Sequence, residues 1–268
     1  MHPGVNAAAI ATALLGLAAA TTVEALELKA ITRGRDGAVA YLLDADGRHL
    51  WAFTEGRRLY AHTLARIDDD SVHLKADPHR PEVGDVQLQL GPTTAVLPDA
   101  APTDTTVSLD LRHDDPHHAL YLLGAAAGED LLVHDDVRTP VTLGVRRTSV
   151  EAARSRLIDG SGVCRRQRGA FAVYARCEDL PPEGPQVAVP RGEEITLEFV
   201  RGDLGDVMRL FVDISGFHIT CPPELARRRI TVRAHDRPWN EVLDGVLALY
   251  GYVWRVADTR LLLAPRRP

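Results

Sequence analysis

The chain has 268 residues, enough for two or three small domains, and its 45% hydrophobic and 25% charged residues are ordinary for a globular protein. Aromatic residues make up only 5%, so the core must be built mainly from aliphatic side chains. The formal net charge of −6 argues against nucleic acid as a partner.

The first predicted element is the apolar run Ala7–Ala20 (AAAIATALLGLAAA), which has the length of a signal-peptide core and ends in small residues. It is shorter than the roughly 20 residues that cross a bilayer. The preceding MHPGVN lacks Lys and Arg, and no Cys follows the run to carry a lipid anchor. We predict a signal peptide over residues 1–25 and export of the chain. An uncleaved anchor is the alternative.

Residues 26–76 predict a small all-β module, because turn signals recur about every ten residues and no helical stripe lies between them. The expected strands are Leu28–Ile31, Ala38–Leu43, Leu50–Phe53, Leu59–Ile67 and Val72–Leu74. Residues 77–105 hold five prolines and predict a linker with one strand at Val86–Leu90.

Residues 106–177 predict a mixed α/β segment that begins with a strand at Val107. Asp115 and Pro116 supply the cap and first turn of a helix, and Thr148-x-x-Glu151 predicts a capping box for a second helix. A closing hairpin is expected around Arg168–Gly169. A proline-containing linker over residues 178–192 follows.

Residues 193–266 predict the same order of elements. A strand with alternating apolar residues starts at Ile195, and a helix follows with Asp203 at its start and Gly216 at its end. Its apolar stripe comprises Leu204, Val207, Met208, Phe211 and Ile214. Short strands are expected near His218–Cys221 and Ile230–Arg233, then a second helix starting at Trp239 and a hairpin.

The two segments match each other. Val107 onward aligns with Ile195 onward at an offset of 88 residues, Gly128 aligns with Gly216, and after a one-residue insertion Gly162 aligns with Gly251. The sequence therefore predicts an internal repeat. The predicted fold class is α+β, with an all-β module followed by two tandem β-α-β-β-α-β-β domains.

The pattern of D-L-x-x-V-x-x-L, S-G-x-x-I, I-T-V and P-W-x-x-V-L within residues 195–265 resembles the short N-terminal domain of secretins and TonB-dependent transducers. It is most similar to the periplasmic domain of type IV pilus secretins. Residues 26–76 are similar to the β domain of the pilus inner-membrane lipoprotein and the type II secretion homology region, with an unrelated β module as the alternative. The resemblance implies a periplasmic location and a protein-binding role.

The densest group of possible metal ligands is His113, Asp114, Asp115, His117 and His118. A zinc or copper site can be drawn from it, but its spacing fits no closed ligand set and Asp115 already has a capping role. No metal, other cofactor or catalytic residue is predicted, because no phosphate loop, dinucleotide fingerprint or nucleophile motif is present.

The three cysteines leave a disulfide undecided. Cys164 and Cys177 flank the predicted hairpin, but a turn at Arg168–Gly169 places residue 164 opposite about 173, too far from 177 for an unstrained bridge. Cys221 precedes two prolines and is predicted to be a small buried side chain.

An open two-stranded edge in each α/β segment can accept a partner strand, and the main partner contact is expected in the second segment. The predicted partner-binding residues are Arg227, Arg228, Arg229, Ile230 and Val232. These observations favour a non-catalytic periplasmic adaptor that contacts a secretin or inner-membrane components and meets the membrane only through partners or an uncleaved N-terminus. A regulatory module related to TonB-dependent transducers and a metal-binding protein are the alternatives.

Overall fold

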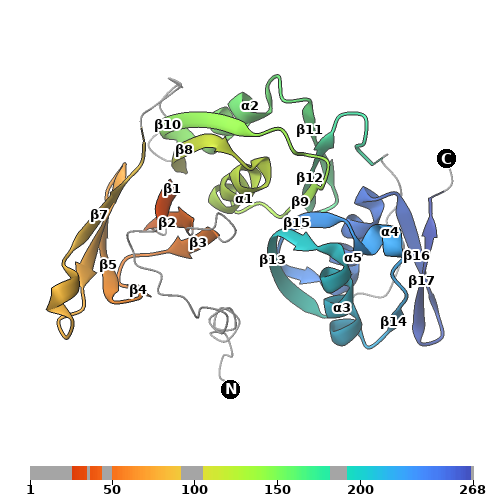
Figure 1. The fold of residues 1–268 in the computed structure, drawn as a ribbon. Helices are drawn as coiled ribbons and strands as arrows, with labels where there is room; N and C mark the ends of the chain where they lie inside the picture. The colour runs from red at the N-terminus through yellow and green to blue at the C-terminus, as the bar shows by residue number, and fades with distance from the viewer. Residues whose placement is uncertain (1–25, 35–36, 44–49, 92–104, 182–191, 267–268) are drawn as a thin grey trace, which may run out of the picture.

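A computed structural model describes residues 26–34, 37–43, 50–91, 105–181 and 192–266 (Figure 1). Within them the chain is a mixed α+β protein with several sheets. The predicted signal peptide, most of the second linker and residues 92–104 of the first linker lie outside the described residues. No described helix is long and apolar enough to span a membrane.

The described N-terminal residues form strands and a short 3-10 helix. The elements are β1 (Glu27–Gly34), β2 (Gly37–Leu43), β3 (Leu50–Phe53), β4 (Arg58–Leu59), β5 (His62–Ile67), β6 (Ser71–Ala76), the 3-10 helix η2 (Pro81–Val83) and β7 (Val86–Gln89). The predicted strand Leu59–Ile67 is divided by a turn at Tyr60, whose φ is 54°. β7 confirms the predicted strand at Val86, but it pairs with β6 in the four-stranded sheet β4-β5-β6-β7, so residues up to 89 belong to a sheet and not to a linker.

Two α/β segments follow. The first segment (residues 106–177) contains β8 (Thr106–Asp114), α1 (Pro116–Ala127), β9 (Leu131–His134), β10 (Val141–Ser149), α2 (Val150–Ile158), β11 (Val163–Arg168) and β12 (Phe171–Arg176). The second segment (residues 193–266) contains β13 (Glu194–Asp203), α3 (Leu204–Ser215), β14 (His218–Ile219), α4 (Pro223–Ala226), β15 (Arg229–Pro238), α5 (Trp239–Leu249), β16 (Tyr252–Ala257) and β17 (Arg260–Pro265).

Apart from the four-residue helix α4, which the repeat did not predict and which the first segment lacks, the two segments share element order, and they also share strand pairing. Val141, Leu143 and Val145 of β10 lie opposite Asp114, Leu111 and Leu109, and at the aligned positions Ile230, Val232 and Ala234 of β15 lie opposite Gly202, Phe199 and Leu197. The hairpins β11–β12 and β16–β17 also have the same register. Aligned bulge residues even share a positive φ, 59° at His113 and 52° at Arg201. The sequence repeat is therefore accompanied by a repeat of backbone geometry.

The helix caps test the local sequence rules. Asp115 caps α1 through its side chain, and Gly128 and Gly216 adopt the left-handed conformation at the ends of α1 and α3 (φ 64° and 71°), as predicted. The capping box at Thr148 is wrong, because β10 continues through Thr148 and Ser149 caps α2 instead. Asp203 occupies the predicted cap position of α3 but makes no side-chain cap bond.

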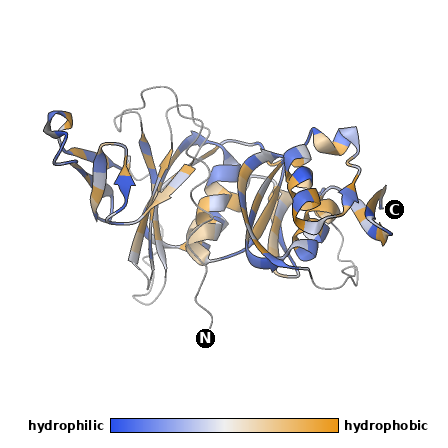
Figure 2. Cartoon of the chain, turned by 90° about the horizontal axis from the view of Figure 1, so that it is seen from below, coloured by the Kyte–Doolittle hydropathy of each residue, from blue (hydrophilic) through white to orange (hydrophobic). Residues whose placement is uncertain are grey.

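Strand pairing joins neighbouring parts of the chain. β1 pairs with β8, which gives the sheet β10-β8-β1-β2-β3, and β9 pairs with β15, which gives the sheet β11-β12-β9-β15-β13. Alternate residues of β9 and β12 point to opposite faces of the second sheet. Leu131 and Val133 enter the core of the first segment, whereas Leu132 and Phe171 enter the core of the second. Figure 2 shows the hydropathy of each described residue along the ribbon, with hydrophobic residues on both the strands and the helices.

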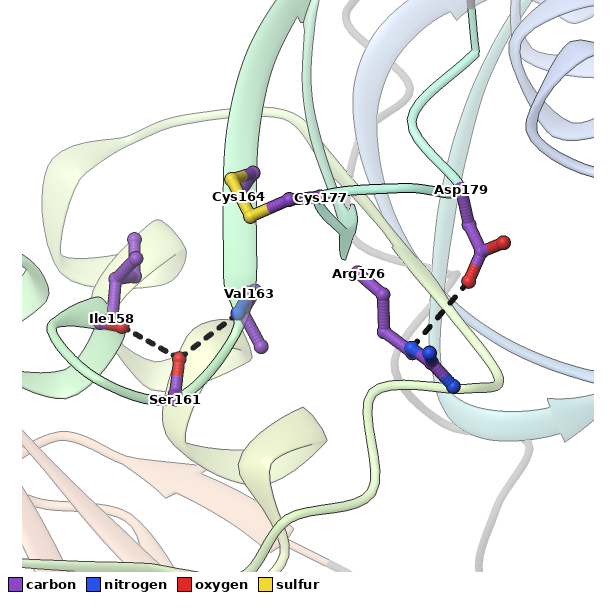
Figure 3. Close-up of a disulfide and its surroundings, with 7 residues drawn as sticks. All are labelled: Ile158, Ser161, Val163, Cys164, Arg176, Cys177 and Asp179. Atoms are coloured by element: carbon purple, nitrogen blue, oxygen red, sulfur yellow. Dashed lines mark hydrogen bonds and ion pairs between the residues drawn. A yellow bond between two sulfur atoms is a disulfide. The ribbon is translucent and has the colours of Figure 1, made fainter.

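Cys164 and Cys177 form a disulfide with a Cα–Cα distance of 4.8 Å, within the usual range (Figure 3). The predicted register was wrong by two residues, because the hairpin turns at Gly169–Ala170 and places Cys164 opposite Ala175. Ser161 supports the start of β11, since its hydroxyl donates to the Ile158 carbonyl at 2.6 Å and accepts from the Val163 N–H at 3.1 Å.

Trp239 provides a test of the second core. It is buried (7% exposed), and its ring centroid lies 6.2 Å from that of Phe217 and 6.1 Å from that of Trp254. Trp239→Ala should lower the free energy of unfolding by about 3–5 kcal/mol, because the truncation leaves a cavity. Val256→Ala, at a side chain that is 43% exposed, is the control and should change it by less than about 0.5 kcal/mol. Equal effects in chemical denaturation would contradict this description of the core.

Candidate protein-interaction site

The predicted partner strand is not an open edge. β15 pairs with β13 on one side and with β9 on the other, and Ile230 lies opposite His134 while Val232 lies opposite Leu132. Both Ile230 and Val232 are fully buried. The expectation of a partner strand at this position is wrong, because the first segment of the same chain already occupies the edge.

The three arginines before this strand remain on the surface. Arg227, Arg228 and Arg229 are all exposed. Arg228 lies 3.5 Å from the Asp136 carboxylate of the first segment, and Arg229 lies 3.3 Å from Asp203. Arg228 therefore contributes to the contact between the segments, and exposed pairs of this kind are individually weak.

The buried carboxylate of Asp130 stabilises the contact between β9 and β15. Asp130 is 4% exposed at its side chain and accepts hydrogen bonds from the His235 backbone N–H at 2.9 Å and from the Arg237 Nε at 2.5 Å. Beside it, Arg233 donates to the Glu129 carbonyl at 2.7 Å. A buried charge must be paired and hydrogen-bonded to be tolerated, so these contacts fix the position of β15 beside β9.

Two residues of the histidine cluster, His117 and Asp115, lie at this contact. His117 is fully buried, and its Nδ1 lies 2.8 Å from the Thr231 hydroxyl of β15. Burial lowers the pKa of His117 to about 4, so the ring is neutral at neutral pH. Asp115 pairs with Arg201 of the second segment at 2.9 Å, and Asp114 pairs with Lys29 at 3.0 Å. Among the described residues, no group of three or more His, Cys, Asp or Glu side chains could hold a metal ion.

A cleft of about 390 Å³ opens where the two segments meet. The His134 ring of the first segment lies against the Tyr250 ring of the second, with centroids 4.7 Å apart, and burial lowers the pKa of His134. Asp136, Arg228 and Tyr252 also line it. Its polar groups are largely engaged with one another, since Asp136 faces Arg228 and the Tyr252 hydroxyl donates to Glu224 at 3.1 Å.

A second groove of about 390 Å³ lies beside β10. It is lined by Thr139–Leu143 and by Arg156, Leu157, Asp159, Gly160 and Ser161 around the end of α2. In the sheet β10-β8-β1-β2-β3, β10 is the terminal strand, and no other described strand pairs with its outer edge. The first segment therefore presents the kind of surface that was predicted for the second.

Comparison of the chain with protein-family models, with curated proteins and with solved structures found no match.

The contact between the two segments at β9 and β15 could not be predicted from the sequence. Asp130 follows a turn and reads as an ordinary loop carboxylate, and His117 reads as part of an exposed helix start. The sequence signal for this contact is that aligned positions differ. Asp130 and His117 correspond to His218 and Gly205 in the second segment, so neither is required by the shared fold.

Cys221 is half-buried and carries no disulfide, and burial raises the pKa of its thiol.

Asp130 tests the contact energetically. Asp130→Ala should lower the free energy of unfolding by about 3 kcal/mol, because it leaves the His235 N–H and the Arg237 guanidinium without their buried acceptor. The control is Asp206→Ala, which removes an exposed ion pair with Arg209 and should cost less than about 1 kcal/mol. Similar losses in urea denaturation of the two variants would contradict the assigned role of Asp130.

Proposed function

We propose that the chain is a non-catalytic periplasmic adaptor of a secretin-based envelope machine, of the type IV pilus or type II secretion kind. In this proposal residues 106–177 and 193–266 are tandem secretin-type domains that bind partner proteins. The proposal is supported by the shared element order and strand register of the two segments.

One observation carries the proposal: the parts of this chain associate by adding strands to each other's sheets. β1 is added to β8, and β9 is added to β15, in both cases antiparallel. Main-chain hydrogen bonds across such edges provide affinity with little dependence on side-chain identity, which suits a module that joins different proteins.

The disulfide supports the proposed location. Cys164–Cys177 links the strand β11 to the residue after β12. Disulfides persist in oxidising compartments such as the bacterial periplasm and are rare in the cytosol. This agrees with export through the predicted signal segment Ala7–Ala20.

The proposal predicts a specific association in the cell envelope. The full chain, tagged at its C-terminus, should co-purify with a secretin or with inner-membrane components of a pilus or secretion machine. Mass spectrometry of the purified material identifies the partners, and the same tag on an unrelated periplasmic protein is the control. Recovery of the chain without any such component, or with the control protein's background alone, would contradict the adaptor role.

A further inference from the structure

β10 and β15 are each the third strand of their segment and occupy equivalent positions. They differ in whether another described strand pairs with their outer edge. β15 carries β9 along its outer edge over Ile230–Arg233, and the aligned stretch of β10 starts at Val141. The equivalence extends to a side chain. The hydroxyls of Thr142 and Thr231 each accept a hydrogen bond from the backbone N–H of the positive-φ residue, His113 and Arg201, both at 3.0 Å.

The groove beside β10 is the counterpart of the surface on which the first segment sits. Arg156 and Leu157 of the groove align with Gly245 and Val246 of α5. Gly245 is in close contact with the first segment, since a Cβ built there would lie 2.8 Å from Leu132 and 3.6 Å from Phe171. On the second segment, Leu132 and Phe171 of the first segment cover this surface, whereas on the first segment the equivalent surface is the groove beside β10.

The chemistry of the groove shows what kind of occupant it suits. The apolar surface of the second segment is replaced by polar residues, with Arg156 at the position of Gly245, Asp159 at that of Ala248 and Ser161 at that of Tyr250. Arg156 is exposed, and none of the described carboxylates forms an ion pair with it. Because Leu132 of β9 is the side chain that reaches Gly245, the equivalent side chain of an occupant would face Arg156.

We propose that Val141–Leu143 of β10 and the adjoining groove bind an extended strand of another protein. The strand adds antiparallel to β10, as β9 adds to β15, and carries Asp or Glu at the position equivalent to Leu132, where its carboxylate pairs with Arg156. The polar lining makes this a reversible contact, unlike the buried one between the segments. The inference rests on the proposed adaptor function and names the surface and the chemistry of the partner.

A second copy of this chain is a poor occupant. The equivalent of β9 in the second segment is β14, which has only two residues and is followed by Thr220-Cys221-Pro222-Pro223. Proline has no N–H to donate and ends the strand edge. In addition, Arg260 aligns with Phe171, so head-to-tail docking would bring Arg260 towards Arg156, and like charges repel.

The test uses synthetic peptides and the full chain. The peptide with the sequence of residues 129–136 is prepared with Leu132→Glu and with Leu132→Lys, and binding is followed by NMR chemical-shift changes of the protein. We expect the Glu peptide to bind about tenfold more tightly than the Lys peptide, with shifts centred on Val141–Leu143. In the Arg156→Glu protein the order of the two peptides should reverse. Arg57→Glu, an exposed arginine of the β4–β7 region, is the matched control and should leave the order unchanged.

Several results would overturn the proposal. These are no binding of either peptide at millimolar concentration, shifts centred on another strand edge, or a preference that Arg156→Glu leaves unchanged. A concentration-dependent dimer of the wild-type chain that Arg156→Glu abolishes would identify a second copy as the occupant.

The peptide test is independent of the adaptor role. If co-purification with the envelope machine persists while the peptides fail, the partner binds elsewhere, and if co-purification fails while the peptides succeed, the groove serves another protein.

Discussion

The structure depends on one strand contact, the antiparallel pairing of β9 with β15. It makes a single sheet from strands of both segments, and it places Leu132 and Phe171 of the first segment in the core of the second. Asp130 and His117 secure the ends of this pairing with buried hydrogen bonds. Because backbone groups in a sheet must be paired, covering this edge within the chain removes it as a site for partners. β10 is the equivalent strand of the first segment, and among the described strands only β8 pairs with it.

The same fold therefore has two different surfaces at equivalent positions. In the second segment the surface around Gly245 is apolar and covered by Leu132 and Phe171 of the first segment, whereas in the first segment Arg156 makes the equivalent surface polar. Desolvating a polar groove costs more than desolvating an apolar one, so a contact formed there is easier to reverse. This difference agrees with the proposed adaptor role, in which the two segments stay together and a partner strand would bind reversibly at β10.

Local features were predictable from the sequence, and long-range ones were not. The Asp115 cap, the left-handed Gly128 and Gly216 and the burial of Trp239 follow from propensities and periodicity within a few residues. The disulfide depended on a hairpin register that turn residues alone did not fix. The Asp130–Arg237 contact joins residues that are 107 positions apart in the sequence. No local sequence pattern determines which strand edges pair with each other.

Native-state hydrogen exchange of the full chain tests the central pairing most directly. A strand flanked on both sides protects every amide, whereas an edge strand protects only alternate ones, since the others point to solvent. The pairing of β15 with both β13 and β9 predicts slow exchange at each of the amides from Ile230 to Arg233. Fast exchange at alternate amides of this stretch would show that β15 is an edge strand and would contradict the account.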